Sequence, residues 1–437
     1  MNFYGIRRRV LSKTFQSFKG LKSSTEAGGS AQSGISSNDL HLFTQFNWYS
    51  LVDCLLPFSL FAFLLPVHVE FWMLLILVCW LVIKMSLRAF RDRTYLYVLA
   101  VFFISISTFF RPMAVSSLSD LLLVLFAFVV GAGCSRKRWM WSLWILASMG
   151  VVAIVALNVI YEPGGVRFFS TDSVSWFLPS FRIMIGKIHV NLSGYLLGSV
   201  SLVGYGIWRH NRFKARWLAF GFAVIAYSLT FLTGSKASAF LPIVSILFAE
   251  LAWKYRKMIQ GKAMLLAMAF LGIGLMFSLM LYLPNGPLSK ISTNESARSQ
   301  VAQCFFREAT YSWPRFFRGN GGDAVSEYCE DRVVVISRKG RSLSGLVPHA
   351  HNSYLQIFAD YGVFPVILLL IVFVFSIRNA LNLAASGDGL LGTMGFSLGL
   401  FLFFFGLFDS TLLSWSINQV MTGYLLAVSW PERILTQ

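Results

Sequence analysis

The chain is built largely of apolar segments that are each long enough to cross a lipid bilayer. A spanning helix needs about 20 mostly apolar residues, and about twelve segments of this kind follow one another. We expect them near 48–67, 69–84, 94–110, 115–134, 139–158, 191–208, 216–233, 237–253, 263–283, 361–377, 388–408 and 412–430. Because 56% of the 437 residues are hydrophobic and only 13% are charged, an ordinary soluble domain is excluded. The sequence predicts an all-α polytopic membrane protein.

The basic residues indicate how these helices are oriented. A net charge of +18 could suit nucleic acid, but the charges recur in short blocks between apolar segments. The blocks follow the even-numbered segments and read Lys84/Arg88/Arg91/Arg93, Arg136/Lys137/Arg138, Arg209/Arg212/Lys214/Arg216 and Lys254/Arg256/Lys257/Lys262. Cytoplasmic loops of membrane proteins carry an excess of Lys and Arg. We therefore expect both termini to be cytoplasmic, membrane lipids as neighbours and no nucleic-acid partner.

The N-terminal segment differs in composition from the rest. Residues 1–44 are basic at first and become Ser/Gly-rich from Ser23 to Ser37, which is typical of a disordered tail. No charged, apolar and small-residue pattern of a cleavable signal peptide opens the sequence. We expect a cytoplasmic tail at 1–44 and a single transmembrane domain at 45–437.

Two connectors on the outer side, 159–190 and 284–360, are much longer than the others, and long loops often carry function. Their cations include Arg167, Arg182, Lys187, Arg298, Arg315 and Arg318, and their histidines include His189, His349 and His351. Outer loops are normally poor in cations. Each cation could contact lipid head groups or an acidic neighbour. Their recurrence in both connectors favours a binding site on the outer face.

A segment that leads into the tenth span carries a recognisable pattern. His351, Asn352, Leu355, Gln356 and Gly362 are spaced as H-N-x-x-L-Q-x-x-x-x-x-G. This pattern resembles the signature of the O-antigen ligase and polymerase superfamily.

Three further segments resemble that superfamily and stand in its order. They are Arg182, Gly186, Asn191 and Gly194 in FRIMIGKIHVNLSGYLL, then Thr233-Gly234-Ser235-Lys236-Ala237, and then Glu295-Ser296-Ala297-Arg298 with Phe317-Arg318-Gly319-Asn320-Gly321. Lys236 stands where the superfamily usually has arginine. The resemblance covers about residues 180 to 375.

The resemblance implies a GT-C-like glycosyltransferase of the Gram-negative inner membrane, with a large periplasmic loop before its last three helices. Its donor would be a glycan on undecaprenyl diphosphate, and its acceptor the lipid A-core oligosaccharide of lipopolysaccharide. Cleavage of the glycosyl–phosphate bond leaves negative charge that a metal or fixed cations must stabilise. The diphosphate-binding candidates are Arg182, Arg298, Arg318 and Lys236. Arginine suits phosphate because its planar fork donates two parallel hydrogen bonds.

A base is needed to take the proton of the acceptor hydroxyl, and histidine titrates closest to neutral pH. We expect His351 to be this base, with His349 as the second candidate. Either could instead be an ordinary loop or capping histidine. A zinc site at His-x-His lacks cysteine or carboxylate at ligand spacing, and no aspartate pair is evident on the outer side. We therefore expect no metal and no cofactor, and a single displacement that inverts the anomeric configuration.

Two alternatives stay open at this point. A polymerase of the same superfamily would pass the glycan to a growing chain rather than to lipid A-core. A transporter or flippase should carry charges or Gly/Pro breaks near mid-helix in matched halves, whereas here the ionisable residues concentrate at segment ends. Among the five cysteines, Cys304 and Cys329 share the long outer connector, and we expect them to form a disulfide.

Overall fold

The structure is a computed structural model, and it describes residues 166–170, 181–185, 190–210, 216–233, 235–282, 296–321, 324–332, 349–410, 412 and 422–423. The predicted tail at 1–44 and the five predicted spans between 48 and 158 lie outside the described residues. The total of about twelve spans therefore stays a prediction.

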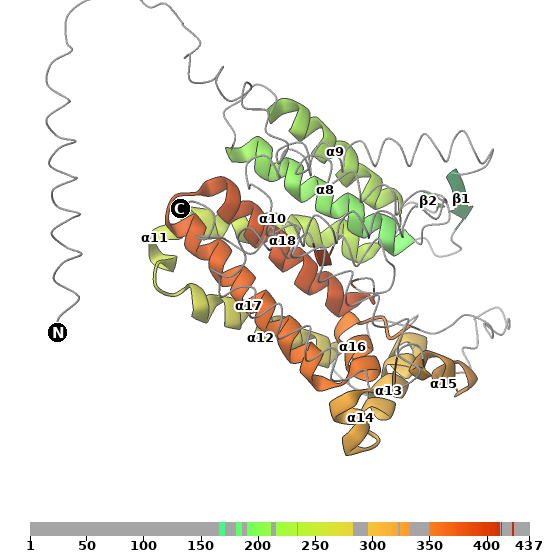
Figure 1. Cartoon of the computed structure of the whole chain (residues 1–437). Coiled ribbons are helices and arrows are strands. Elements are labelled where there is room, and N and C mark those ends of the chain that lie inside the picture. The colour runs from blue at the N-terminus through green and yellow to red at the C-terminus, as the bar shows by residue number, and fades with distance from the viewer. Residues whose placement is uncertain are drawn as a thin grey trace, which may run out of the picture. The chain divides into compact units, whose positions relative to one another are not determined.

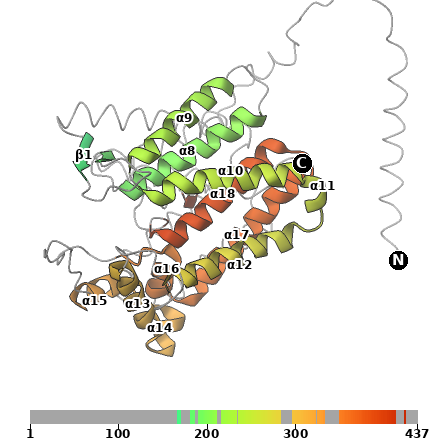
Figure 2. The same cartoon turned by 180° about the vertical axis from the view of Figure 1, so that it is seen from behind.

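The described part is almost entirely helical (Figures 1 and 2). Its helices are α8 (Val190–His210), α9 (Arg216–Leu232), α10 (Lys236–Lys254), α11 (Arg256–Ile259), α12 (Ala263–Tyr282), α13 (Ser296–Thr310), α14 (Trp313–Arg318), α15 (Ala324–Arg332), α16 (Ser353–Tyr361), α17 (Val363–Ala385) and α18 (Gly389–Phe408). Three of them, α10, α17 and α18, are long and apolar enough to cross a membrane. The chain is thus a helical protein with membrane-spanning character.

Helix α18 lies at the centre of the packing. It contacts α8, α10, α12, α16 and α17, and nearly all of its residues are buried. Its Phe396, Phe401, Phe403 and Phe405 rings fill the core between these neighbours. A helix that is apolar on every face is expected to be enclosed on every face. By contrast, α10 and α17 keep exposed apolar faces.

Strands β1 (Val166–Ser170) and β2 (Phe181–Ile185) form an antiparallel pair in which Phe169 lies opposite Arg182. This pair is a small departure from the all-α prediction within the described residues, and it belongs to the predicted outer connector 159–190. It packs beside α8 and α9 through β2.

The second predicted connector, 284–360, also contains regular structure. Helices α13, α14 and α15 and most of α16 lie in it, gathered near the first residues of α17 (Figures 1 and 2). Val301, Phe305 and Ala309 of α13 are buried at helical spacing against α16. Helix α11 contacts α17 as well, at the other end of the bundle in both views.

Candidate functional site

The histidine-containing segment is fixed to the start of α16 by two of its own polar residues. Asn352 is the N-cap residue: its Oδ1 accepts a hydrogen bond from Leu355 N at 3.0 Å, and its Nδ2 donates to Leu407 O at 3.2 Å. Gln356 Oε1 accepts from Ala350 N at 3.1 Å. An N-cap side chain satisfies an amide that the first helical turn leaves without an intrahelical partner. Asn352 and Gln356 therefore act by holding the backbone of residues 349–352.

The two histidines lie on this held backbone. His351 is half-buried and has φ of +51°, a left-handed conformation that few non-glycine residues adopt. His349 is exposed, with buried Ala350 between the two. The preference for His351 as the base stays a prediction.

The same segment is tied to the end of α18. Ser353 N donates to Asp409 O at 3.1 Å, and Ser353 Oγ donates to the same oxygen at 2.7 Å. Ser353 Oγ also accepts from Leu412 N at 3.2 Å. All three residues are buried. Ser353 thus joins the beginning of α16 to the chain that leaves α18.

Two of the segments that resemble the superfamily are in direct backbone contact. A Cβ added at Gly319 would meet Asp360 O, and one added at Gly362 would meet Phe317 O. Asn320 N donates to Ala359 O at 2.9 Å, and Gly321 N donates to Asp360 O at 3.0 Å. Gly319, Gly321 and Gly362 all have φ between +72° and +97°. At positions 319 and 362 glycine is needed both for the positive φ and for the close approach of the two backbones, whereas Gly321 has open space around it.

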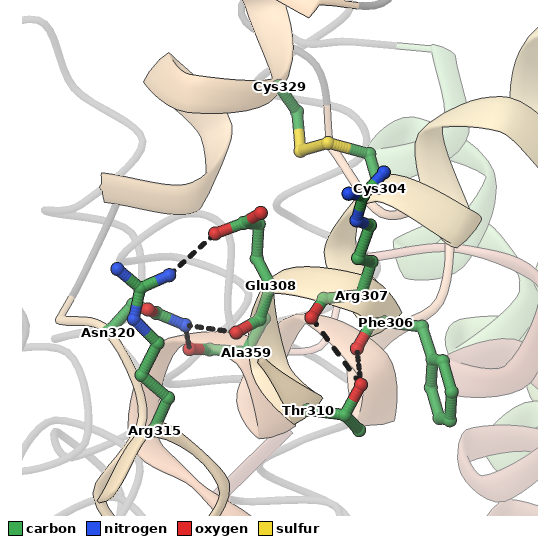
Figure 3. Close-up of polar contacts among 9 residues, drawn as sticks. All are labelled: Cys304, Phe306, Arg307, Glu308, Thr310, Arg315, Asn320, Cys329 and Ala359. Atoms are coloured by element: carbon green, nitrogen blue, oxygen red, sulfur yellow. Dashed lines mark hydrogen bonds and ion pairs between the residues drawn. A yellow bond between two sulfur atoms is a disulfide. The ribbon is translucent and has the colours of Figure 1, made fainter. Parts of the chain in front are cut away.

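Figure 3 shows how side chains reinforce this contact. Asn320 Nδ2 donates to Ala359 O at 3.0 Å and to Glu308 O at 3.5 Å, so it bridges α13 and α16. A Cys304–Cys329 disulfide, with Cα atoms 6.1 Å apart, joins α13 to α15 and confirms the predicted pairing. Helices α13 to α16 are thus tied together by a covalent bond as well as by hydrogen bonds.

The cations of this cluster differ in their surroundings. Arg315 NH1 lies 2.7 Å from Oε2 of buried Glu308, so its charge is already matched within the protein (Figure 3). Arg318, at the end of α14, is exposed, and none of the described acidic side chains pairs with it. Arg315 therefore has a structural role, whereas Arg318 keeps a charge that a ligand could use.

The other two resembling segments also touch each other. Gly194 of α8 packs against the start of α10, and a Cβ added there would meet Ser238 Oγ and lie 2.6 Å from Ser238 Cβ and 3.2 Å from Ser235 Cβ. Ser238 Oγ donates to Ser235 Oγ at 2.9 Å. Lys236, the first residue of α10, is exposed, and among the described residues no acid pairs with it. The small residues of these segments let α8 and α10 approach closely.

A run of hydrogen bonds joins the two pairs of segments. Tyr195 Oη of α8 lies 3.0 Å from Thr422 Oγ1, and Thr422 Oγ1 donates to Leu412 O at 3.0 Å. Leu412 N in turn donates to Ser353 Oγ at 3.2 Å. The Tyr195 ring also packs on Phe401 and Phe405 of α18. The segment after Gly194 and the segment after His351 are therefore connected around the end of α18.

The two arginines expected to clamp the diphosphate lie on different elements. Arg182 is in β2, which packs beside α8, and Arg298 is near the start of α13, which packs against α16. Each element thus borders one of the two connected pairs of segments. Convergence of the two guanidinium groups on one cavity stays a prediction.

Sequence reasoning assigned no structural role to several residues that build this region, including Glu308, Ser353 and Tyr195. One signal was present: Val301, Phe305 and Ala309 recur every four residues, which is typical of a helix with one buried face. That spacing predicts α13 inside the supposed loop. The side chains of Ser353 and Tyr195 form hydrogen bonds with residues at least 56 positions away in the sequence, and no local pattern indicates these partners.

No group of three or more His, Cys, Asp or Glu side chains among the residues that the structure describes is arranged to hold a metal ion. No family model matches the chain, and no curated protein was found to be significantly similar to it.

Proposed function

We propose that this chain is a glycosyltransferase of the O-antigen ligase and polymerase superfamily, working in the Gram-negative inner membrane. It would act as an O-antigen ligase, transferring a glycan from undecaprenyl diphosphate to the lipid A-core oligosaccharide on the periplasmic side. The observation that carries the proposal is the contact between resembling segments: Gly194 packs on Ser235 and Ser238, and Gly319 and Gly362 fix two backbones together. Segments far apart in the sequence thus lie against each other in two pairs, which supports a shared site.

The described cations support an anionic donor. Arg318 and Lys236 are exposed and have no acidic partner among the described residues. Arg182 and Arg298 would hold the diphosphate by paired hydrogen bonds, because the guanidinium fork matches two phosphate oxygens. As the glycosyl–oxygen bond breaks, fixed cations stabilise the charge that develops on the leaving diphosphate.

The acceptor side of the reaction is assigned to His351. Its imidazole takes the proton of the acceptor hydroxyl while that oxygen forms a bond to the anomeric carbon and the diphosphate leaves with the electron pair. One displacement inverts the anomeric configuration. The backbone of His351 is held between Ala350 and Asn352, whose hydrogen bonds to Gln356 and Leu355 limit its motion. A positioned base is effective because the reacting groups need little further ordering.

The test is a reaction of the purified full-length protein in nanodiscs with an undecaprenyl-diphosphate-linked glycan. Lipid A-core is offered in one arm and a second lipid-linked chain in the other, each with and without a metal chelator. We expect product on lipid A-core, with inverted configuration and no effect of the chelator. Product only on the second chain would identify a polymerase. Binding of the donor with no transfer to either acceptor would contradict the enzymatic proposal.

A further inference from the structure

Helix α14 and its surroundings present an exposed set of aromatic rings. The exposed fractions are 69% for Tyr311, 74% for Trp313, 40% for Phe317 and 57% for Phe306 of α13. No residue of α14 is buried, although its rings are ordered against one another: Trp313 stacks on Phe317 at 5.7 Å between centroids. Large rings that stay exposed on a tightly attached helix indicate an interaction surface.

This surface is fixed to the beginning of α17. Phe317 stacks on Phe364, in the first turn of α17, with centroids 5.7 Å apart. The close contact of Gly319 with Asp360 O and of Gly362 with Phe317 O holds α14 against the α16–α17 junction. The position of the α14 rings relative to a membrane is therefore set by the position at which α17 begins.

The exposed rings continue into the exposed face of an apolar helix. Phe364, Ile367 and Ile371 lie on one face of α17 and are exposed by 45%, 45% and 39%. Helix α17 is long and apolar enough to cross a membrane, so this face is the one that acyl chains would cover. The stacked rings of Trp313, Phe317 and Phe364 form an unbroken extension of it.

We propose that α14 is a membrane-surface anchor, with the aromatic rings of residues 311–317 inserted among the phospholipid head groups where α17 enters the bilayer. Tryptophan and tyrosine favour this layer because one part of each ring system is apolar and another can hydrogen-bond. Exposed Arg318 supplies a positive charge beside the rings, which suits lipid phosphate. The anchor goes beyond the proposed glycosyl transfer, since it would hold α13 to α16 at the lipid surface whatever reaction the chain carries out.

The experiment measures the depth of single positions in the full-length protein in nanodiscs of phosphatidylethanolamine and phosphatidylglycerol. A fluorescent amino acid replaces Trp313, and its quenching by lipids brominated near the head-group end of the acyl chain is compared with quenching by aqueous iodide. The same residue at Ile367 serves as the lipid-exposed control. Glu327, exposed on α15 of the same helix cluster, serves as the water-exposed control. Correct folding is checked by the Cys304–Cys329 disulfide on a non-reducing gel.

We expect the probe at position 313 to be quenched several-fold more by brominated lipid than the probe at position 327, and to be protected from iodide. Iodide quenching equal to that at position 327, without lipid quenching, would overturn the anchor. Protection from both quenchers would also overturn it, because a second copy or another protein would then cover α14. Tyr311, the neighbouring exposed ring, is the second probe position if the Trp313 variant does not fold.

Discussion

A glycine with positive φ lies just outside each end of helix α17, but only the first of these glycines is closely packed against other residues. Gly362 has φ of +87°, and a Cβ there would meet Phe317 O and lie 2.5 Å from Phe317 C. Gly387 has φ of +94°, and a Cβ there would meet nothing within 4 Å. Both turns need glycine for their backbone conformation, yet the turn beside the candidate site also needs it for packing. Positive φ alone is enough to require glycine in a turn, as at Gly387. At Gly362 the close backbone contact, which joins two of the resembling segments, requires it as well.

The largest expected effect comes from Gly362→Ala. Gly362 has φ of +87° and ψ of −175°, a region that is essentially reserved for glycine, so the substitution adds backbone strain of about 1–3 kcal/mol. The backbone clash adds about 1–3 kcal/mol, so the free energy of unfolding should fall by about 3 kcal/mol or more. Gly387→Ala is the matched control and should cost only the strain, about 1–2 kcal/mol. Thermal unfolding of both variants in detergent measures the contrast, and equal losses would show that the packing at Gly362 contributes little.

Reduction of the Cys304–Cys329 disulfide should destabilise the same end of α17. The bond closes a loop with a sequence separation of 25, for which the chain-entropy estimate gives about 3 kcal/mol. We expect limited proteolysis to cleave within α13 to α15 after reduction, while the α17–α18 turn stays protected. The double substitution of both cysteines by serine should reproduce the pattern. Cleavage at the α17–α18 turn instead would show that the disulfide stabilises both ends.

A smaller effect is expected at the two N-caps. Asn352 Oδ1 and Asp388 Oδ1 accept from the third residues of α16 and α18, Leu355 N and Leu391 N, at 3.0 and 3.1 Å. Asn352 is buried and also donates to Leu407 O, whereas Asp388 is exposed. Asn352→Ala should therefore lower the free energy of unfolding by about 2 kcal/mol, and Asp388→Ala by about 1 kcal/mol. If thermal unfolding showed a larger loss of stability for Asp388→Ala than for Asn352→Ala, the difference in packing between the two ends of α17 would be contradicted.

A further effect is a pH dependence at the open end of α17, near the turn that contains Gly387. His210 lies two residues beyond the predicted span 191–208, beside Trp253 and Gly389. Burial, with a smaller contribution from Arg209, lowers its pKa to about 4, while Glu250 and Asp388 act in the opposite direction. Between pH 6.5 and 4 the unfolded chain takes up a proton that the folded chain does not, so stability should fall as the pH falls. His210→Gln should remove that part of the slope of unfolding free energy against pH.

The sequence predicted most of the described apolar helices closely, but it ended the span 361–377 eight residues too early, since α17 begins at Val363 and ends at Ala385. The segments 237–253, 263–283 and 388–408 differ from α10, α12 and α18 by one residue at most at either end, because a long apolar run specifies its own helix. It also predicted the Cys304–Cys329 bond.

Other features depended on contacts that no local pattern reveals. Arg315 looked like one more outer cation, and only the fold shows that buried Glu308 neutralises it. Asn352, Gln356 and Gly362 appeared as one signature, but they have separate roles in the structure. Asn352 caps α16, Gln356 accepts a hydrogen bond from the Ala350 amide, and Gly362 allows a close backbone contact. A close contact between two backbone segments leaves no periodic pattern in the sequence, so it could not be predicted.

The measurement that tests the central claim most directly compares donor binding with transfer in His351→Ala, His349→Ala and Arg298→Ala. Binding of an undecaprenyl-diphosphate-linked glycan and its transfer to lipid A-core are measured on the same nanodisc preparations. Loss of a general base should reduce transfer by about 10²–10⁴-fold, so His351→Ala should bind donor normally and scarcely transfer. His349→Ala should keep most activity, and Arg298→Ala should lose donor binding. Normal transfer by His351→Ala, or a larger loss in His349→Ala, would contradict the account.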